Sequence, residues 1–88
     1  MSWYVYMVRC KDNSLYTGST NDLSRRIQVH NSGKGAKYTK SRLPVTLVYR
    51  EECPDKSTAL KRECEIKRLT KAKKEQLATK TGCDFDKE

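Results

Sequence analysis

Residues 4–30 read YVYMVRCKDNSLYTGSTNDLSRRIQVH and place two short strand-like segments ahead of one short helix. The first segment, residues 3–10, is rich in aromatic and β-branched side chains, which favour extended backbone. Both of its alternating faces are apolar, so we expect a central strand that is covered on both sides. Residues 11–14 supply turn chemistry, and residues 15–17 return as the second strand of a hairpin. Gly18 is expected to end that strand, where it permits a sharp turn or the close approach of a ligand.

The end of this stretch predicts a helix over residues 23–31. Residues 19–22 are Ser, Thr, Asn and Asp, which are good N-cap residues. At helical spacing Arg26 and His30 flank the apolar stripe on one side, and Arg25 points away from it. Two plain structural interpretations stay open for the flanking pair: a solvated arginine whose stem lies on the core edge, and a helix-end histidine that is satisfied locally.

The remainder of the chain predicts one loop, one strand and two helices. They are a loop over residues 31–43, a strand over residues 45–51, a helix over residues 57–70 that is capped within residues 55–57, and a helical stretch over residues 71–80. We expect one domain over residues 1–80 and a disordered tail over residues 81–88, because 88 residues leave no room for a second core.

Positive charge is concentrated in the middle of the chain. The formal net charge is +8, and residues 23–50 hold seven basic side chains and no acidic one. Such a cluster attracts polyanions, of which nucleic acid is the commonest. The loop over residues 31–43 is either a plain connection or a segment that follows a phosphate backbone, with Tyr38 as a stacking surface. The predicted nucleic-acid contacts are Arg25, Lys34, Lys37, Tyr38, Lys40, Arg42 and Lys67.

Glu63 is a carboxylate in an unexpected place. It falls near the centre of the apolar stripe that the predicted helix over residues 57–70 would bury. That stripe consists of Ala59, Leu60, Cys64 and Ile66. Burying a bare carboxylate costs several kcal/mol, so Glu63 must be paired, bound to a metal ion or protonated. Lys67, four residues further on, is an available ion-pair partner.

The cysteines predict no special chemistry. Cys10, Cys53, Cys64 and Cys83 form no C-x-x-C pair, and the chain has one histidine, so a zinc site has few ligands to draw on. The first residues lack the pattern of a signal peptide. We therefore expect free thiols in a soluble, cytoplasmic protein.

Five of these features, in this order and spacing, resemble the GIY-YIG nuclease domain. They are YVY at residues 4–6, YTG at residues 16–18, Arg26, His30, and the helical pattern A-x-x-x-E-x-x-I formed by Ala59, Glu63 and Ile66. The phrase HNSGKGAKYTKSRLP over residues 30–44 is similar to short stand-alone bacterial members of the YhbQ type. The first motif departs from the family pattern, with Tyr4 in place of Gly and Val5 in place of Ile, and the second has Thr17 in place of Ile.

The resemblance implies a small α/β (α+β) domain, a three-stranded antiparallel sheet flanked by helices, that cuts phosphodiester bonds with one divalent ion, Mg²⁺ or Mn²⁺. It implies that Tyr16 is the general base or positions the attacking water, and that Tyr6 lines the same pocket. Arg26 would neutralise the charge that develops on phosphorus, and Glu63 would hold the metal. His30 would bond to a tyrosine or to a phosphate oxygen, or would act as the base itself.

Elementary chemistry agrees with most of these roles. A lone carboxylate suits Mg²⁺ or Mn²⁺, which keep most of their water ligands, and does not suit a two-metal nuclease. A guanidinium donates two parallel hydrogen bonds to a phosphate and stays charged. An ordinary tyrosine has a pKa of about 10 and is almost fully protonated at pH 7, whereas histidine is better tuned to act as a base.

Three functions are therefore carried forward. The first is a metal-dependent endonuclease, structure- or strand-selective with little sequence specificity, that acts on DNA rather than RNA in DNA repair or recombination. A protein partner is a possible source of specificity. The second is a nucleic-acid-binding module with little or no turnover. The third is a protein-interaction adaptor whose basic face docks an acidic partner.

Overall fold

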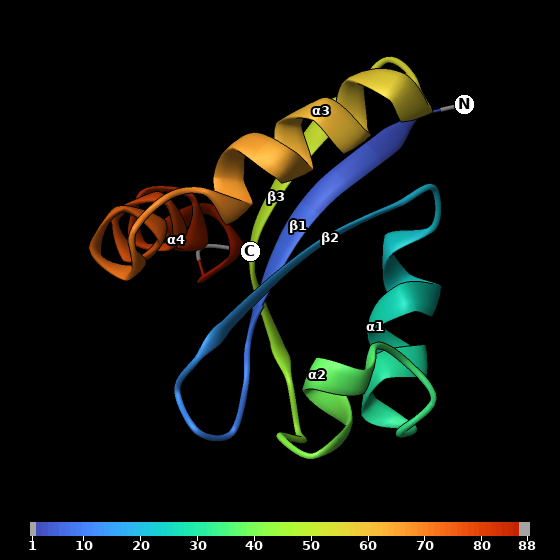
Figure 1. The fold of residues 1–88 in the computed structure, drawn as a ribbon, viewed down its shortest axis with the longest axis vertical. Coiled ribbons are helices and arrows are strands. Elements are labelled where there is room, and N and C mark those ends of the chain that lie inside the picture. Colours follow the sequence, from blue (N-terminus) through green and yellow to red (C-terminus); the bar gives the residue numbers. More distant parts are fainter. Residues whose placement is uncertain (1, 87–88) are drawn as a thin grey trace.

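A three-stranded antiparallel sheet forms the centre of the molecule. The computed structural model describes the backbone of residues 2–86 and the side chains of residues 2–79. The elements are β1 (Trp3–Arg9), β2 (Leu15–Thr20), α1 (Leu23–Asn31), α2 (Lys37–Lys40), β3 (Thr46–Cys53), α3 (Lys56–Lys67) and α4 (Lys71–Asp86). The strand order is β2-β1-β3, and both pairings are antiparallel (Figure 1). The predicted fold class is thereby confirmed.

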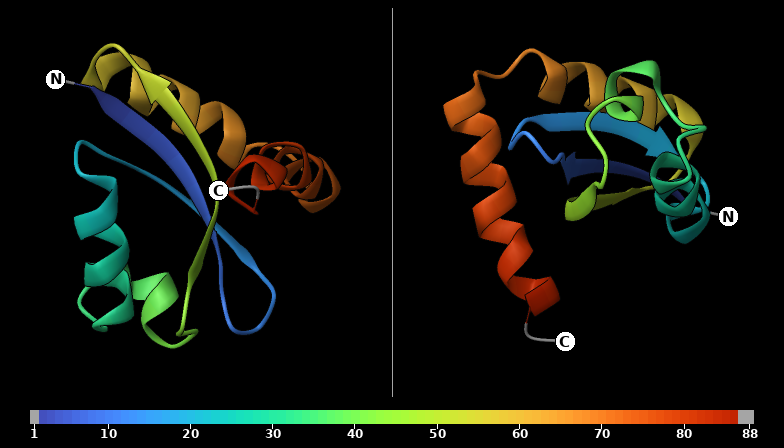
Figure 2. Two further views of the ribbon diagram at one scale, coloured as in Figure 1. Left: turned by 180° about the vertical axis from the view of Figure 1, so that it is seen from behind. Right: turned by 90° about the horizontal axis from the view of Figure 1, so that it is seen from below.

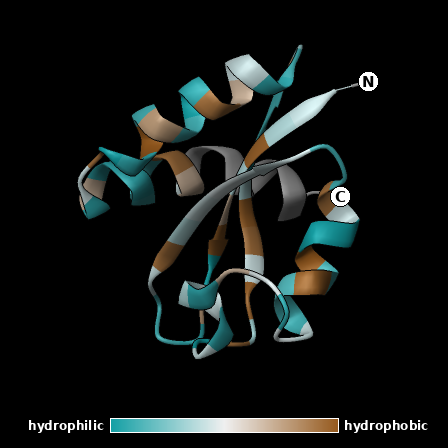
Figure 3. Ribbon diagram, turned by 45° about the vertical axis from the view of Figure 1, so that its right-hand side comes forward, coloured by the Kyte–Doolittle hydropathy of each residue, from teal (hydrophilic) through white to brown (hydrophobic). Residues whose placement is uncertain are grey.

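The central strand β1 is buried on both faces, as its sequence predicts. Val5 and Met7 face a core that β3, α3 and α4 complete, and Tyr6 and Val8 face a second core on the opposite side. All four side chains are at most 1% exposed. The helices divide accordingly, with α3 and α4 on one side of the sheet and α1 and α2 on the other (Figure 2). The hydropathy colouring agrees with this arrangement, since apolar positions gather along β1 and on part of α1 (Figure 3).

Carboxylate caps begin two of the helices. The Asp22 side chain accepts a hydrogen bond from the Arg25 backbone N–H at the start of α1, at 3.2 Å. The Asp55 side chain accepts one from the Thr58 N–H at the start of α3, at 2.8 Å. Caps of this kind stabilise a helix by about 1 kcal/mol each. Both lie among the predicted candidates.

Gly18 does not end β2, contrary to the prediction. The strand continues to Thr20, and Gly18 pairs with Tyr6 across the sheet. A Cβ atom at position 18 would lie 2.6 Å from the Tyr6 hydroxyl oxygen. The glycine therefore makes room for a buried phenol on the neighbouring strand, which the sequence of β2 alone does not reveal.

Two further predictions need correction. The segment 31–43 is not loop throughout, because it contains the single-turn helix α2. The apolar stripe of α3 is narrower than predicted, since Leu60 is 48% exposed and Cys64 is also exposed. Ala59 and Ile66 are the fully buried side chains of α3.

Helix α4 packs against the sheet through Ala78 and through an ion pair between Arg9 of β1 and Glu75, at 2.6 Å. Its backbone is helical to Asp86, and residues 87–88 lie outside the described residues, so the disorder expected for residues 81–88 stays a prediction. Cys10, Cys53 and Cys64 are free thiols, and Cys83 lies beyond the described side chains. No helix within residues 2–86 is long and apolar enough to cross a membrane.

Candidate active site

A buried hydrogen-bond chain connects β1 to α1 and α2. The Tyr6 hydroxyl lies 2.9 Å from Nε2 of His30, and Nδ1 of His30 lies 2.8 Å from the Thr39 hydroxyl. Tyr6 is 1% exposed, and His30 and Thr39 are fully buried. His30 is therefore satisfied by residues far from it in sequence, and the expectation of a bond to a tyrosine is met by Tyr6.

The directions of these hydrogen bonds determine which ring nitrogen of His30 carries the proton. The Thr39 hydroxyl donates to the Ala36 carbonyl at 3.0 Å, so it has only an acceptor to offer to His30. Nδ1 of His30 consequently carries the proton, and Nε2 accepts from the Tyr6 hydroxyl. Burial lowers the pKa of His30, and the positive charge of Arg26 lowers it further, which keeps the ring neutral at pH 7.

Two glycines leave space for this pair of rings. Gly18 lies against the Tyr6 hydroxyl, as described above, and Gly35 passes directly over His30. A Cβ atom at position 35 would lie 2.4 Å from Nδ1 of His30. Because real Cβ atoms do not approach so closely, any larger residue at position 35 would displace the imidazole.

Arg26 extends the chain to solvent. Its Nε–H donates to the Tyr6 hydroxyl at 3.4 Å, and its side chain is partly exposed. Burial raises the pKa of Tyr6, and the hydrogen bond and charge of Arg26 oppose that rise. Tyr16 and Glu63 are near enough to add smaller upward effects on the same pKa. The guanidinium is thus joined to the hydrogen-bond chain through Nε.

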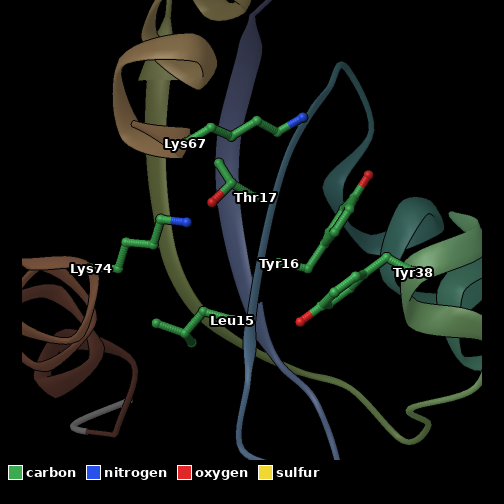
Figure 4. A pocket seen from close by; sticks show the side chains of 6 residues that line it. All are labelled: Leu15, Tyr16, Thr17, Tyr38, Lys67 and Lys74. Carbon is green, nitrogen blue, oxygen red and sulfur yellow. The ribbon is translucent and has the colours of Figure 1, made fainter. Parts of the chain in front are cut away.

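Tyr16 of β2 stands beside this chain. Its ring centroid is 5.4 Å from that of His30 in an edge contact, and it stacks on Tyr38 of α2 at 5.9 Å. The guanidinium of Arg42 also lies over the Tyr38 ring, with its Cζ 4.1 Å from the ring centroid. Figure 4 shows the Tyr16 and Tyr38 rings side by side. Tyr16 is more exposed than Tyr6.

Glu63 of α3 lies on the face of β2 opposite to Tyr16, beside Ser19. Its Oε1 accepts a hydrogen bond from the Ser19 hydroxyl at 2.7 Å, and its Oε2 is paired with Lys67 Nζ at 2.7 Å. Lys67 Nζ lies 5.9 Å from the Tyr16 ring centroid. The predicted Glu63–Lys67 pair therefore exists, and it lies at the outer edge of β2 together with Tyr16. Glu63 raises the pKa of Lys67 through this contact.

The oxygen donors at Glu63 suit a single hydrated ion. Within the part of the chain that the structure describes, no group of three or more His, Cys, Asp or Glu side chains could hold a metal. One carboxylate with a hydroxyl beside it matches Mg²⁺ or Mn²⁺, which keep several waters and add a phosphate oxygen. The ammonium of Lys67 occupies a cation position on this carboxylate.

The basic side chains predicted to contact nucleic acid differ in their surroundings. Arg25, Lys34, Lys37 and Lys40 are exposed on α1, α2 and the segment between them. Arg42 is committed to the protein, since it pairs with Asp12 at 3.0 Å and donates to the Tyr38 carbonyl at 2.7 Å. A groove lies over β2 between α2 on one side and α3 and α4 on the other (Figure 4); it is lined by Leu15, Tyr16, Thr17, Tyr38, Lys67 and Lys74.

Sequence reasoning missed several members of this region. The predicted site residues do not include Ser19, Gly35 and Thr39, or the groove residues Leu15, Thr17 and Lys74. Ser19 directly follows the YTG triplet, and its position on the face of β2 opposite to Tyr16 was the available signal. Gly35 and Thr39 act only through His30, which lies on another element, so no local pattern identifies them.

Comparison with known proteins defines the class to which this fold and site belong. The family model of the GIY-YIG catalytic domain matches residues 2–76. The chain therefore belongs to the GIY-YIG family, whose domain is typical of endonucleases acting on nucleic acid and generally dependent on metal.

Within this family the chain is similar to proteins named UPF0213. A UPF0213 protein of Staphylococcus haemolyticus is 59% identical over 71 residues, which are 81% of this chain and 87% of the relative. One of Haloquadratum walsbyi is 54% identical over 83 residues, 94% of this chain and 92% of the relative. The solution NMR structure of the UPF0213 protein BH0048 from Bacillus halodurans aligns with a TM-score of 0.60 at 51% identity, covering 93% of this chain and 87% of that one. These names state no activity.

Proposed function

We propose that the protein is a metal-dependent endonuclease that hydrolyses phosphodiester bonds in DNA, with selectivity for structure or strand and little for sequence. One observation carries the proposal: five side chains from four elements are linked around the outer edge of β2 through hydrogen bonds, ring contacts and Lys67. They are Tyr6, Tyr16, Arg26, His30 and Glu63. The family assignment supports the nucleic-acid substrate. The proposal of DNA over RNA rests on the family resemblance alone. Each cleavage assay therefore includes a matched RNA substrate.

Arg26 is the proposed phosphate ligand. With Nε held by the Tyr6 hydroxyl, its two Nη groups are left to donate to the oxygens of the scissile phosphate. The guanidinium would stabilise the negative charge that builds on these oxygens as the pentacovalent transition state forms. Tyr6, His30 and Thr39 then position Arg26, since each holds the next through a hydrogen bond.

Tyr16 is the proposed contact for the attacking water. Its ring is held between His30 and Tyr38, and it is the less buried of the two motif tyrosines. The water oxygen would form a bond to phosphorus, its proton would leave towards the tyrosines, and the leaving oxygen would take up a proton as its bond to phosphorus breaks. His30 is fully buried with both ring nitrogens engaged, so a proton would reach it only through the Tyr6 hydroxyl.

Glu63 is the proposed metal ligand, with the Ser19 hydroxyl orienting the carboxylate. A divalent ion bound there would supply positive charge to the phosphate and leaving oxygen. The exposed cations Arg25, Lys34, Lys37 and Lys40 would contribute binding that depends on salt and not on sequence. Any further specificity would then come from the shape of the substrate or from a protein partner.

A cleavage panel tests this function. Purified protein is incubated with Mg²⁺ or Mn²⁺ and labelled single-stranded, duplex and branched DNA, with matched RNA, beside the Glu63→Ala variant. We expect metal-dependent nicks in DNA that Glu63→Ala abolishes. Salt-sensitive binding without cleavage, unchanged by Glu63→Ala, would support the binding-module function instead. Absence of both, with no competition by DNA for a protein partner, would leave the adaptor function.

A further inference from the structure

Lys67 occupies the position on Glu63 that a metal ion would take. Its Nζ lies 2.7 Å from Oε2 of Glu63, and the other carboxylate oxygen is already held by the Ser19 hydroxyl. The same Nζ lies 5.9 Å from the centre of the Tyr16 ring. Figure 4 shows the Lys67 side chain extending across the edge of β2 towards Tyr16. Both oxygens of Glu63 are therefore engaged before any ion arrives.

The two partners differ in their freedom to move. The Glu63 side chain is 16% exposed, and the Lys67 side chain is 49% exposed. A lysine on the solvent side of such a pair can swing its flexible stem outward without any change in the backbone. Glu63 stays in place because α3 and Ser19 hold it. An arriving cation would therefore displace Lys67 and leave the carboxylate where it is.

We propose that Lys67 is a resident cation on Glu63 that a divalent ion must displace, so that Lys67 sets the metal concentration at which the site becomes loaded. This inference rests on the proposed function, because it takes Glu63 as the metal ligand, and it adds a regulatory step to that function.

Displacement also changes the charge that faces the substrate. The Glu63–Lys67 pair is neutral as a whole, so an ion that enters the pair adds its full positive charge to the groove. A phosphate backbone then binds more strongly, and by reciprocity the bound nucleic acid strengthens metal binding. Metal and nucleic acid would consequently load together, and the protein without substrate would hold metal weakly.

The test measures metal binding and not cleavage. Mn²⁺ is titrated into the ¹⁵N-labelled protein, and paramagnetic broadening of the Ser19 and Glu63 amide signals gives a dissociation constant. The variants are Lys67→Met, which removes the competing charge, and Lys67→Arg, which keeps it. Lys61→Met is the matched control, because Lys61 is an exposed lysine of the same helix. Amide signal dispersion verifies that each variant is folded.

We expect Lys67→Met to bind Mn²⁺ about threefold to tenfold more tightly than the wild-type protein, since a partly exposed ion pair and a nearby like charge each oppose the ion modestly. Lys67→Arg and Lys61→Met should not tighten binding beyond about twofold, as screened surface charges have small effects. Broadening at Ser19 with equal or weaker affinity in Lys67→Met would overturn this inference and leave the proposed function standing. No broadening at Ser19 in either the wild type or Lys67→Met would overturn the metal assignment as well.

Discussion

The two buried threonines of the described chain should respond oppositely to the same substitution. Thr39 is fully buried and its hydroxyl makes two hydrogen bonds, to His30 and to the Ala36 carbonyl. Thr17 is 2% exposed, and its hydroxyl has no hydrogen-bond partner. Valine matches threonine in shape and lacks the hydroxyl, so Thr→Val at each position isolates the polar contribution.

Thr39→Val leaves the Nδ1–H of His30 buried without an acceptor, which costs about 1–3 kcal/mol, and it removes one further bond worth about 1 kcal/mol. We therefore expect the free energy of unfolding to fall by about 2–4 kcal/mol. Thr17→Val removes a hydroxyl that is buried without compensation, so stability should be unchanged or rise by up to about 1 kcal/mol.

Urea unfolding at pH 7 measures both effects. An equal slope of unfolding free energy against urea concentration in wild type and variants would show that the unfolded state is unchanged. The ¹⁵N chemical shifts of the His30 ring provide a second measurement. They should report a proton on Nδ1 in the wild type, because the Thr39 hydroxyl offers this nitrogen only an acceptor. Equal losses of stability at the two positions, or a wild-type ring protonated on Nε2, would refute the assigned direction of the hydrogen-bond chain.

Three further predictions concern Gly35, His30 and Glu75. Gly35→Ala should destabilise the fold by about 1–3 kcal/mol, because its Cβ would overlap the His30 ring; thermal or urea unfolding measures this, and an unchanged stability would contradict the close approach. Because the pKa of His30 is lowered in the folded protein, the unfolded protein binds a proton first as the pH falls below about 6.5. The free energy of unfolding should therefore decrease from that pH down to the pKa of His30 in the folded protein. His30→Asn should lack this decrease, and a decrease that persisted in the variant would contradict the lowered pKa. Glu75→Ala should lower the free energy of unfolding by about 0.5 kcal/mol, because it removes the ion pair with Arg9. That pair lowers the pKa of Glu75, so its contribution to stability should be lost as acid protonates the carboxylate. A stability difference between wild type and variant that did not change with pH would contradict the ion pair as its source.

The sequence predicts the local parts of this molecule well. Aromatic and β-branched content places β1, and the Asp22 and Asp55 caps place the starts of α1 and α3. The Glu63–Lys67 pair is one helical turn apart, so spacing alone reveals it. The arginine and histidine of α1 are recognisable through the family resemblance, and helical spacing puts them on one side of the helix.

Contacts between distant segments were not predictable in the same way. Gly18 reads locally as the end of a strand, yet β2 continues because the missing side chain accommodates a phenol on β1. The hydrogen bond from Ser19 to Glu63 joins residues 44 positions apart. Thr39 is an ordinary threonine in a basic segment until the fold places it against His30. Each of these depends on how the sheet brings two elements together, which no local pattern records.

Adjacent arginines on α1 provide the most direct test of the proposed active site. Arg26 donates to Tyr6 within the candidate site, and Arg25 is exposed beside it, so Arg26→Ala and Arg25→Ala remove the same side chain from two different environments. The measurement is the single-turnover rate of DNA cleavage with saturating protein and Mg²⁺. We expect Arg26→Ala to lower this rate by about a hundredfold or more, as removal of a transition-state donor does, and Arg25→Ala to change it by less than about threefold. Equal rates for the two variants, both close to the wild type, would contradict the proposed active site.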